Sequence, residues 1–334
     1  MIRDARVLHP EFVPGDVVHR QHEINTLTAA LEPLTNGNIA EPVFLYGPSG
    51  TGKTCIARYT VEKLRETVFD LEYQYVNCWE DYTRFKTLYR ILDGLDKSFD
   101  IHRQSTPRDV LLDRLRDYDG PPYVVILDEV DQLEDKRILY ELYRTSGVAL
   151  ILIANDETSV FADLNPRLSS RFQTSERIHF NRYSLSELVA ILEDRAKWGL
   201  EPDTVSNSQL KTIADVAAGD ARVAIGILRN AAKKASQQDL NEITGDVIQE
   251  SVPETKSEIR QQNLGKLTDE QRVVYDIIAE ADEIEPSDLY QEYRDRVEDP
   301  KTDRTVRNYL EKMERYNLIR TEGENRGRTY RCIT

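Results

Sequence analysis

The sequence predicts an α/β domain with a parallel sheet, followed by a helical segment and a small C-terminal domain of three helices and a hairpin. The sheet is predicted by a glycine-rich loop that joins an apolar run to a helix, and by two later apolar runs that end in polar residues. From about Ser184 the apolar residues recur at helical spacing only, which marks the change to the helical segment.

The sequence favours a cytoplasmic protein over a membrane or secreted one. The chain has 334 residues, which is enough for two or three domains. It has no apolar run long enough to span a bilayer, and no apolar signal segment follows Met1, so we expect a cytoplasmic protein with no membrane contact. The three cysteines lie far apart and show no metal-ligand spacing.

The chain is strongly acidic, with 59 acidic against 44 basic residues and a net charge of −15. Because proteins that bind nucleic acid are usually basic, this charge counts against such binding over the whole surface, although not on a local patch. An excess of surface carboxylates is also expected of a protein adapted to high salt, which is a hypothesis from composition.

The glycine-rich segment has the spacing of a P-loop. The apolar run from Val43 to Tyr46 predicts a buried strand, and a helix follows Lys53. Glycines let backbone N–H groups approach a phosphate, Lys53 can reach the β- and γ-phosphates, and Thr54 can bind Mg²⁺. We therefore expect ATP or ADP to be bound by Gly47, Pro48, Ser49, Gly50, Thr51, Gly52, Lys53, Thr54 and Cys55.

The segment that precedes the P-loop strand is open to two interpretations. Val17 and Val18 lie just before a helix that carries Ile24, Leu27 and Leu31 on one face. These two valines could pack on a nucleotide base. The alternative, which the spacing alone favours, is a strap over the edge of the domain.

Three more strands are predicted, and two of them end in candidate site residues. The first, residues 72–78, is followed by helical spacing over 84–97 and 107–118. The second, residues 123–128, ends in Asp128, a candidate Mg²⁺ ligand, and Glu129, a candidate to polarise the attacking water. The third, residues 148–154, ends at Asn155, which we expect between the other two strand ends, near the water or the γ-phosphate.

Two arginines, Arg167 and Arg171, lie beyond this last predicted strand. An arginine supplied to a neighbouring subunit can stabilise charge on the γ-phosphate. Either arginine fits that role, and for Arg167 a surface salt bridge is an equally good interpretation. In the helical segment, Gly219-Asp220-Ala221-Arg222 begins a helix whose Arg222 lies opposite the apolar stripe and could point back to the nucleotide.

The C-terminal residues 266–334 have the pattern of a winged helix. They follow a polar stretch over 253–265 that predicts a linker with some helical character. The third helix and the hairpin carry a local basic patch that could contact DNA: Lys301, Arg304, Arg307, Asn308, Arg326 and Arg328. The alternative is a winged helix that docks protein, which the acidic Glu311 and Glu314 on the same helix favour somewhat.

Together the P-loop, Asp128-Glu129, Asn155, Ser170-Arg171-Phe172, Gly219-Asp220-Ala221-Arg222 and the terminal winged helix resemble the AAA+ ATPases. Within these the chain looks like the archaeal replication initiators of the origin-recognition and cell-division-control family. The resemblance implies a nucleotide-binding base over 1–182, a helical lid over 183–252 and a DNA-binding winged helix. It also implies a slow, switch-like ATPase that binds double-stranded origin DNA, helps to load the replicative helicase and can assemble with other initiator subunits.

Residue by residue, the resemblance implies that Val17 and Val18 lie on the adenine side of the site. Asn155 matches sensor 1, Arg171 matches the arginine finger and Arg222 matches sensor 2. The DNA-contacting insertion of the family would fall within residues 79–118, where Arg84, Lys86 and Arg90 are the basic candidates. A clamp-loader-like AAA+ motor and a signalling ATPase with a protein-docking winged helix remain the alternatives.

Overall fold

The computed structural model describes residues 1–38, 40–68, 70–102, 106–157, 160, 172, 175–323 and 327–333. These form two compact units, Met1–Ser251 and Val252–Thr334. Within the described ranges, no helix combines the length and the apolar composition needed to cross a membrane.

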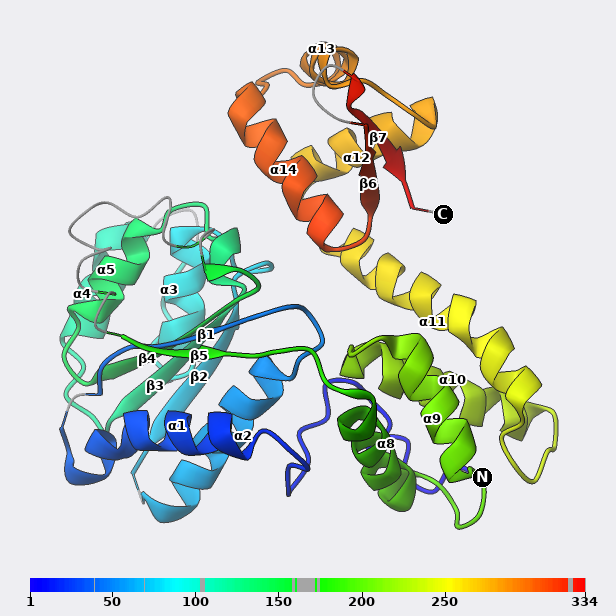
Figure 1. Ribbon diagram of the computed structural model, residues 1–334. Coiled ribbons are helices and arrows are strands. Elements are labelled where there is room, and N and C mark those ends of the chain that lie inside the picture. The colour runs from blue at the N-terminus through cyan, green and yellow to red at the C-terminus, as the bar shows by residue number, and fades with distance from the viewer. Residues whose placement is uncertain are drawn as a thin grey trace. The chain divides into compact units, whose positions relative to one another are not determined.

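The first unit is built on a five-stranded parallel sheet with the strand order β2-β3-β4-β1-β5 (Figure 1). Its strands are β1 (Val43–Tyr46), β2 (Glu72–Asn77), β3 (Tyr123–Asp128), β4 (Val148–Ala154) and β5 (Glu176–His179). Because β4 lies between β3 and β1, Asn155 follows the strand between the one that ends at Asp128 and the one that leads into the P-loop. The predicted position of Asn155 is therefore confirmed.

Helices cover both faces of this sheet. Alternate residues of a strand face opposite sides, so Val43 and Leu45 pack with one set of helices, whereas Phe44 packs with the other. The first set is α1 (Gln21–Leu31), the 3₁₀-helix η1 (Glu32–Asn36) and α2 (Lys53–Thr67). The second set is α3 (Arg84–Asp93), α4 (Arg108–Arg116) and α5 (Arg137–Tyr143), with η2 (Val130–Gln132) after β3.

The strand β5 corrects one prediction, since residues 148–154 are not the last strand of the sheet. Residues Glu176–His179 pair with β1 at the sheet edge, with Ile178 facing Leu45 in register. Only Ile178 of this strand is buried. The strand was missed because an edge strand needs few apolar residues, so its sequence lacks the continuous apolar run of β3 and β4.

Three helices form the lid of the first unit: α8 (Leu185–Gly199), α9 (Asn207–Ala217) and α10 (Ala221–Gln237). Ser184 and Ser206 cap α8 and α9 in reciprocal capping boxes, as the sequence indicates. The N-terminal segment packs against α8, where Ile2 pairs with Leu200 and the buried Arg195 donates to the carbonyls of Val7 and Phe12 at 2.9 and 3.0 Å.

The second unit has the winged-helix arrangement predicted from the sequence. It contains α12 (Asp269–Ala281), α13 (Pro286–Arg296), α14 (Asp303–Arg315) and the antiparallel pair β6 (Ile319–Glu322) and β7 (Thr329–Cys332). Ile284 adds a bridge to Tyr330 of β7, which joins the turn between the first two helices to the hairpin.

The predicted linker is helical: α11 (Gly245–Gly265) covers the whole of 253–265 and contains the boundary between the two units. The stretch is polar because most of its side chains are exposed or only half-buried. Its few buried residues, Thr255, Asn263 and Leu264, are still enough to hold a helix, and Asn263 donates to the carbonyl of Tyr316 at 3.1 Å. Pro253 is tolerated within it.

Candidate nucleotide-binding site

The P-loop connects β1 to α2 with three glycines at positive φ, Gly47 at 142°, Gly50 at 75° and Gly52 at 92°. L-residues with a side chain rarely adopt these angles. Close packing also requires the glycines. A Cβ on Gly50 would overlap the carboxylate of Asp220, and one on Gly52 would lie 2.5 Å from the hydroxyl of Tyr183. The glycines are therefore required for packing against Asp220 and Tyr183, in addition to the proposed binding of phosphate.

Lys53 is folded back into the loop. Its ammonium Nζ donates to the carbonyls of Gly47 and Pro48 at 2.7 and 2.8 Å, and to Asn155 Oδ1 at 3.3 Å. Lys53 is only 7% exposed. This burial lowers the pKa of Lys53 to about 8, with the carboxylate of Asp128 opposing the shift and Arg222 adding to it. The hydrogen-bond acceptors of this ammonium are neutral oxygens, and a phosphate bound in the loop would give it a negatively charged partner.

Thr54 and Asp128 meet at the same edge. The hydroxyl of Thr54 donates to Asp128 Oδ2 at 2.6 Å, and the backbone N–H of Glu129 donates to Asp128 Oδ1 at 2.9 Å. Glu129 itself has a left-handed backbone with φ of 56°. The predicted P-loop, Asp128-Glu129 and Asn155 are thus brought together from three neighbouring strands.

A tyrosine outside the predicted motifs completes this cluster. The hydroxyl of Tyr75, on β2, donates to Asp128 Oδ2 at 3.0 Å. A signal was present in the sequence, because Tyr75 lies two residues before the end of a strand with alternating residues. The sequence did not show that β2 pairs with β3, so the contact between Tyr75 and Asp128 could not be predicted.

The lid reaches the loop through the N-terminus of α10. The N–H of Ala221 donates to the carbonyl of Gly50 at 3.0 Å, and the guanidinium of Arg222 donates to the hydroxyl of Ser49. Asp220 caps the helix by accepting from the N–H groups of Arg222 and Val223 at 2.9 and 3.1 Å. Arg222 therefore points toward the phosphate-binding loop, as its predicted role requires.

Val17 and Val18 are half-buried, and Val17 packs against the core cluster of α1 and α2. Arg20 fixes this segment to the stretch between β5 and α8. Arg20 donates to the carbonyl of Asn181, pairs with Glu23 at 2.7 Å, and its guanidinium carbon lies 4.2 Å from the ring centroid of Tyr183. The adenine-side role of the valines stays a prediction.

Two further residues that were predicted to bind nucleotide, Thr51 and Cys55, lie within or directly after the loop. Thr51 is buried and donates to the carbonyl of Pro48 at 2.8 Å. Cys55 lies in the first turn of α2, and burial raises the pKa of its thiol above the usual value. Arg167, Ser170 and Arg171 lie outside the described residues.

The donor set at this edge fits Mg²⁺. One hydroxyl and one carboxylate are hard oxygen ligands, and Mg²⁺ commonly takes one or two such protein ligands together with phosphate oxygens. Over the part of the chain that the structure describes, no group of three or more His, Cys, Asp and Glu side chains could hold a metal ion. A magnesium ion here would depend on nucleotide to complete its coordination.

In the second unit, most of the predicted basic patch is exposed on or beside α14. Lys301, Arg304, Arg307, Asn308 and Arg328 are exposed, whereas Val306, Leu310 and Met313 face the core. Arg326 lies outside the described residues. Lys301 pairs with Glu270 at 3.2 Å, an exposed ion pair that DNA phosphates could displace at small cost.

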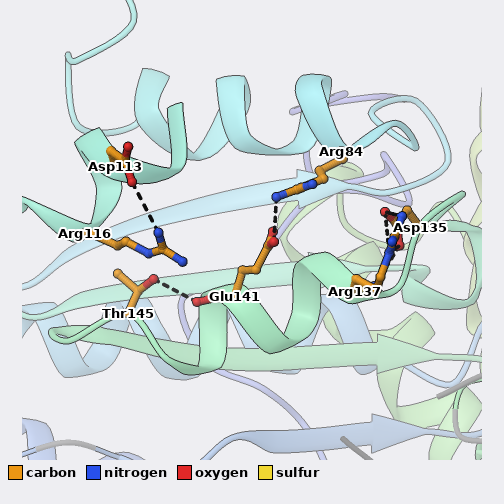
Figure 2. Close-up of polar contacts among 7 residues, drawn as sticks. All are labelled: Arg84, Asp113, Arg116, Asp135, Arg137, Glu141 and Thr145. Atoms are coloured by element: carbon orange, nitrogen blue, oxygen red, sulfur yellow. Dashed lines mark hydrogen bonds and ion pairs between the residues drawn. The ribbon is translucent and has the colours of Figure 1, made fainter. Parts of the chain in front are cut away.

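The basic candidates of the 79–118 insertion are engaged within the protein. Figure 2 shows Arg84 of α3 directed at Glu141 of α5, a pair at 2.5 Å in which each side chain is 19% exposed. Arg90 pairs with Asp81 at 3.1 Å, and Lys86 donates to the carbonyl of Glu80 at 3.2 Å. Arg84 is therefore a structural link between two helices rather than a free cation for DNA.

Two family descriptions match the first unit. The "AAA ATPase domain" matches residues 16–153 and the "Cdc6 AAA+ ATPase-type lid domain" matches residues 189–252. The chain is 58% identical over 308 residues to ORC1-type DNA replication protein 1 of Halobacterium salinarum, covering 92% of this chain and 100% of the relative. It is 50% identical over 333 residues to ORC1-type DNA replication protein 9 of the same organism, covering 100% and 94%.

Solved structures share the fold. The Aeropyrum pernix ORC1 protein, determined in complex with DNA, superposes with a TM-score of 0.77 at 24% identity, covering 99% of this chain and 93% of that one. The Pyrobaculum aerophilum CDC6P structure gives a TM-score of 0.67 at 22% identity, covering 99% and 94%.

Proposed function

The chain belongs to the archaeal ORC1-type DNA replication proteins, and we propose that it couples the nucleotide in its P-loop to the binding of origin DNA by its winged helix. It is an AAA+ ATPase that acts in the initiation of DNA replication, and it binds nucleotide. The contacts of the P-loop, the lid and the winged helix support a specific role for each.

The proposed nucleotide site rests on two hydrogen bonds at the carboxyl ends of the strands. Lys53 bonds Asn155, and Thr54 bonds Asp128. Lys53 would leave the carbonyls of Gly47 and Pro48 and donate to the β- and γ-phosphates. Thr54 and Asp128 would hold Mg²⁺. Bound Mg²⁺ supplies positive charge that neutralises the phosphate oxygens during transfer.

Hydrolysis would depend on Glu129 and Asn155, which follow β3 and β4. The carboxylate of Glu129 accepts a proton from the attacking water, and Asn155 hydrogen-bonds the same water or the γ-phosphate. Arg222 would exchange the hydroxyl of Ser49 for a γ-phosphate oxygen. Since Arg222 belongs to the lid, the presence of that phosphate would bias the position of α10, and the reaction would act as a slow switch.

Assembly would add a second arginine to the site. Arg171 stands in the Ser-Arg-Phe motif that resembles an arginine finger, and we propose that it serves the nucleotide of a neighbouring initiator subunit. Arg167 is the alternative finger.

The winged helix would read double-stranded origin DNA with α14 and the hairpin. The similar Aeropyrum pernix ORC1 protein was determined in complex with DNA, and this chain exposes Arg304, Arg307 and Asn308 on one helix. Phosphate contacts from the arginines would position the domain, and base contacts would give specificity. Loading of the replicative helicase would follow from the ATP-bound complex.

The test is binding of the full-length ADP and ATP forms to the intergenic duplex beside the gene of this protein and to a scrambled duplex, across a salt series. We expect a preference of at least roughly a thousandfold for the intergenic duplex. Replacing Arg304 and Arg307 by Ala should lower the salt slope by about 0.9 for each lost phosphate contact. Arg272→Ala on α12, which removes an exposed cation from another helix, should leave it unchanged. Equal weak binding to both duplexes would instead favour a protein-docking winged helix.

A further inference from the structure

A tyrosine that none of the catalytic motifs contains shares the acceptor of the proposed magnesium site. Asp128 Oδ2 accepts from Thr54 Oγ1 at 2.6 Å and from Tyr75 OH at 3.0 Å, while Asp128 Oδ1 accepts from the N–H of Glu129 at 2.9 Å. With both oxygens bonded and only 7% of Asp128 exposed, the carboxylate is held in a single orientation.

The strand pairing explains why a tyrosine is needed at this position. Asn77 is in register with Asp128, and Tyr75 is in register with Ile126, so Tyr75 starts two residues before the end of its strand on the face covered by α2. Two residues of strand are about 7 Å. Among residues with a terminal hydroxyl, only tyrosine is long enough to cover that distance along the sheet.

The ring of Tyr75 is itself supported from α2. The guanidinium carbon of Arg58 lies 5.6 Å from the ring centroid, and the ring packs against the core cluster beneath the P-loop helix. Tyr75 is therefore fixed at the ring and at the hydroxyl. This arrangement differs from an adventitious surface contact, in which neither end is held.

We infer that Tyr75 is a positioning residue that holds Asp128 for Mg²⁺ when nucleotide is bound, which rests on the proposed role of Asp128. Residues that orient metal ligands typically change metal affinity by tenfold to a hundredfold when they are removed. The hydroxyl of Tyr75 acts on the site through Asp128, so its effect should appear in the metal dependence and not in nucleotide binding without metal.

The chain offers a matched control in Tyr73, on the same strand and the same face. Its hydroxyl donates to the carboxylate of Glu62 at 2.6 Å, away from the site. Tyr73→Phe and Tyr75→Phe therefore each remove one hydroxyl and one bond to a carboxylate, and both keep the ring.

The experiment measures ADP affinity by calorimetry in the presence of Mg²⁺ and in EDTA, together with the Mg²⁺ concentration for half-maximal ATP hydrolysis. For Tyr75→Phe we expect unchanged affinity in EDTA, a roughly tenfold smaller gain on adding Mg²⁺, and a roughly tenfold higher Mg²⁺ requirement. Tyr73→Phe should match the wild type in all three.

The outcomes separate this inference from the proposed function. If Asp128→Asn abolishes the gain from Mg²⁺ and Tyr75→Phe leaves it intact, the inference is overturned and the magnesium site stands. If Tyr75→Phe weakens binding equally with and without Mg²⁺, the tyrosine is only structural and the inference fails. If Asp128→Asn keeps the full gain, both the magnesium role of Asp128 and the inference are wrong.

Discussion

The buried ammonium of Lys53 makes nucleotide binding depend on pH. In the nucleotide-free protein the pKa of Lys53 is lowered to about 8, chiefly by burial. Bound phosphates would raise it again, because they supply negative charge to the ammonium. Binding must therefore take up a proton above pH 8, and affinity must fall as the pH rises through this value.

The magnitude follows from the fraction of Lys53 that is protonated before binding. With a pKa of about 8, that fraction drops from roughly three quarters at pH 7.5 to roughly one tenth at pH 9. The affinity for ADP should fall roughly tenfold over this range, or about 1.4 kcal/mol. Proton uptake on binding should rise from roughly 0.2 to roughly 0.9 per site.

The assay is calorimetric titration with ADP in EDTA, in pairs of buffers that differ in ionisation enthalpy. The metal-free condition isolates Lys53 from Mg²⁺, and the phosphates of ADP are ionised throughout. The nearby thiol of Cys55 does not interfere, since burial raises its pKa above the usual value. Lys53→Met should bind ADP weakly and without pH dependence. Constant affinity and no proton uptake by the wild type at pH 9 would refute the argument.

Three further outcomes are expected. Glu129→Gln should keep ATP binding and lower turnover by roughly a hundredfold or more, and single-turnover hydrolysis at the normal rate would remove Glu129 from its role. Asp220→Ala should lower the free energy of unfolding in urea by about 1 kcal/mol, because α10 loses the acceptor of two N–H groups; Asp220→Asn should lose less, and equal stability of Asp220→Ala and the wild type would contradict the cap. With a net charge of −15, the unfolding midpoint should rise from low to molar KCl if the acidity is an adaptation to salt, and a flat or falling midpoint would end that hypothesis.

The fold and the family were accessible from the sequence because their signals are local. A P-loop is a run of neighbouring residues, and β3 and β4 are continuous apolar runs whose burial on both faces needs no knowledge of partners. The cap at Ser184, the start of α13 at Pro286 and the inward face of α14 are likewise set within one turn of a helix. The comparisons confirm the predicted family and the AAA+ fold.

Other features were not predicted because they depend on contacts between residues that are far apart in the sequence. The edge strand β5 has one buried residue and therefore no apolar run. Arg84 was a basic candidate for DNA contact, but in the fold it pairs with Glu141 of α5. The full extent of the helix over 253–265 was not predicted, because its few buried residues are too sparse to give a clear helical pattern.

The sequence by itself predicted which residues would hold phosphate and metal, since that chemistry requires glycines, a lysine, a hydroxyl and a carboxylate at short, recognisable spacings. Only the tertiary structure decided how they are supported. Tyr75 reaches Asp128 because β2 pairs with β3, and Arg222 reaches Ser49 because α10 points at the loop. The two contacts join residues that are separated by 53 and by 173 positions in the chain. A local pattern indicated the direction of Arg222, but the partner atoms of both side chains are set by the packing of the sheet and the lid.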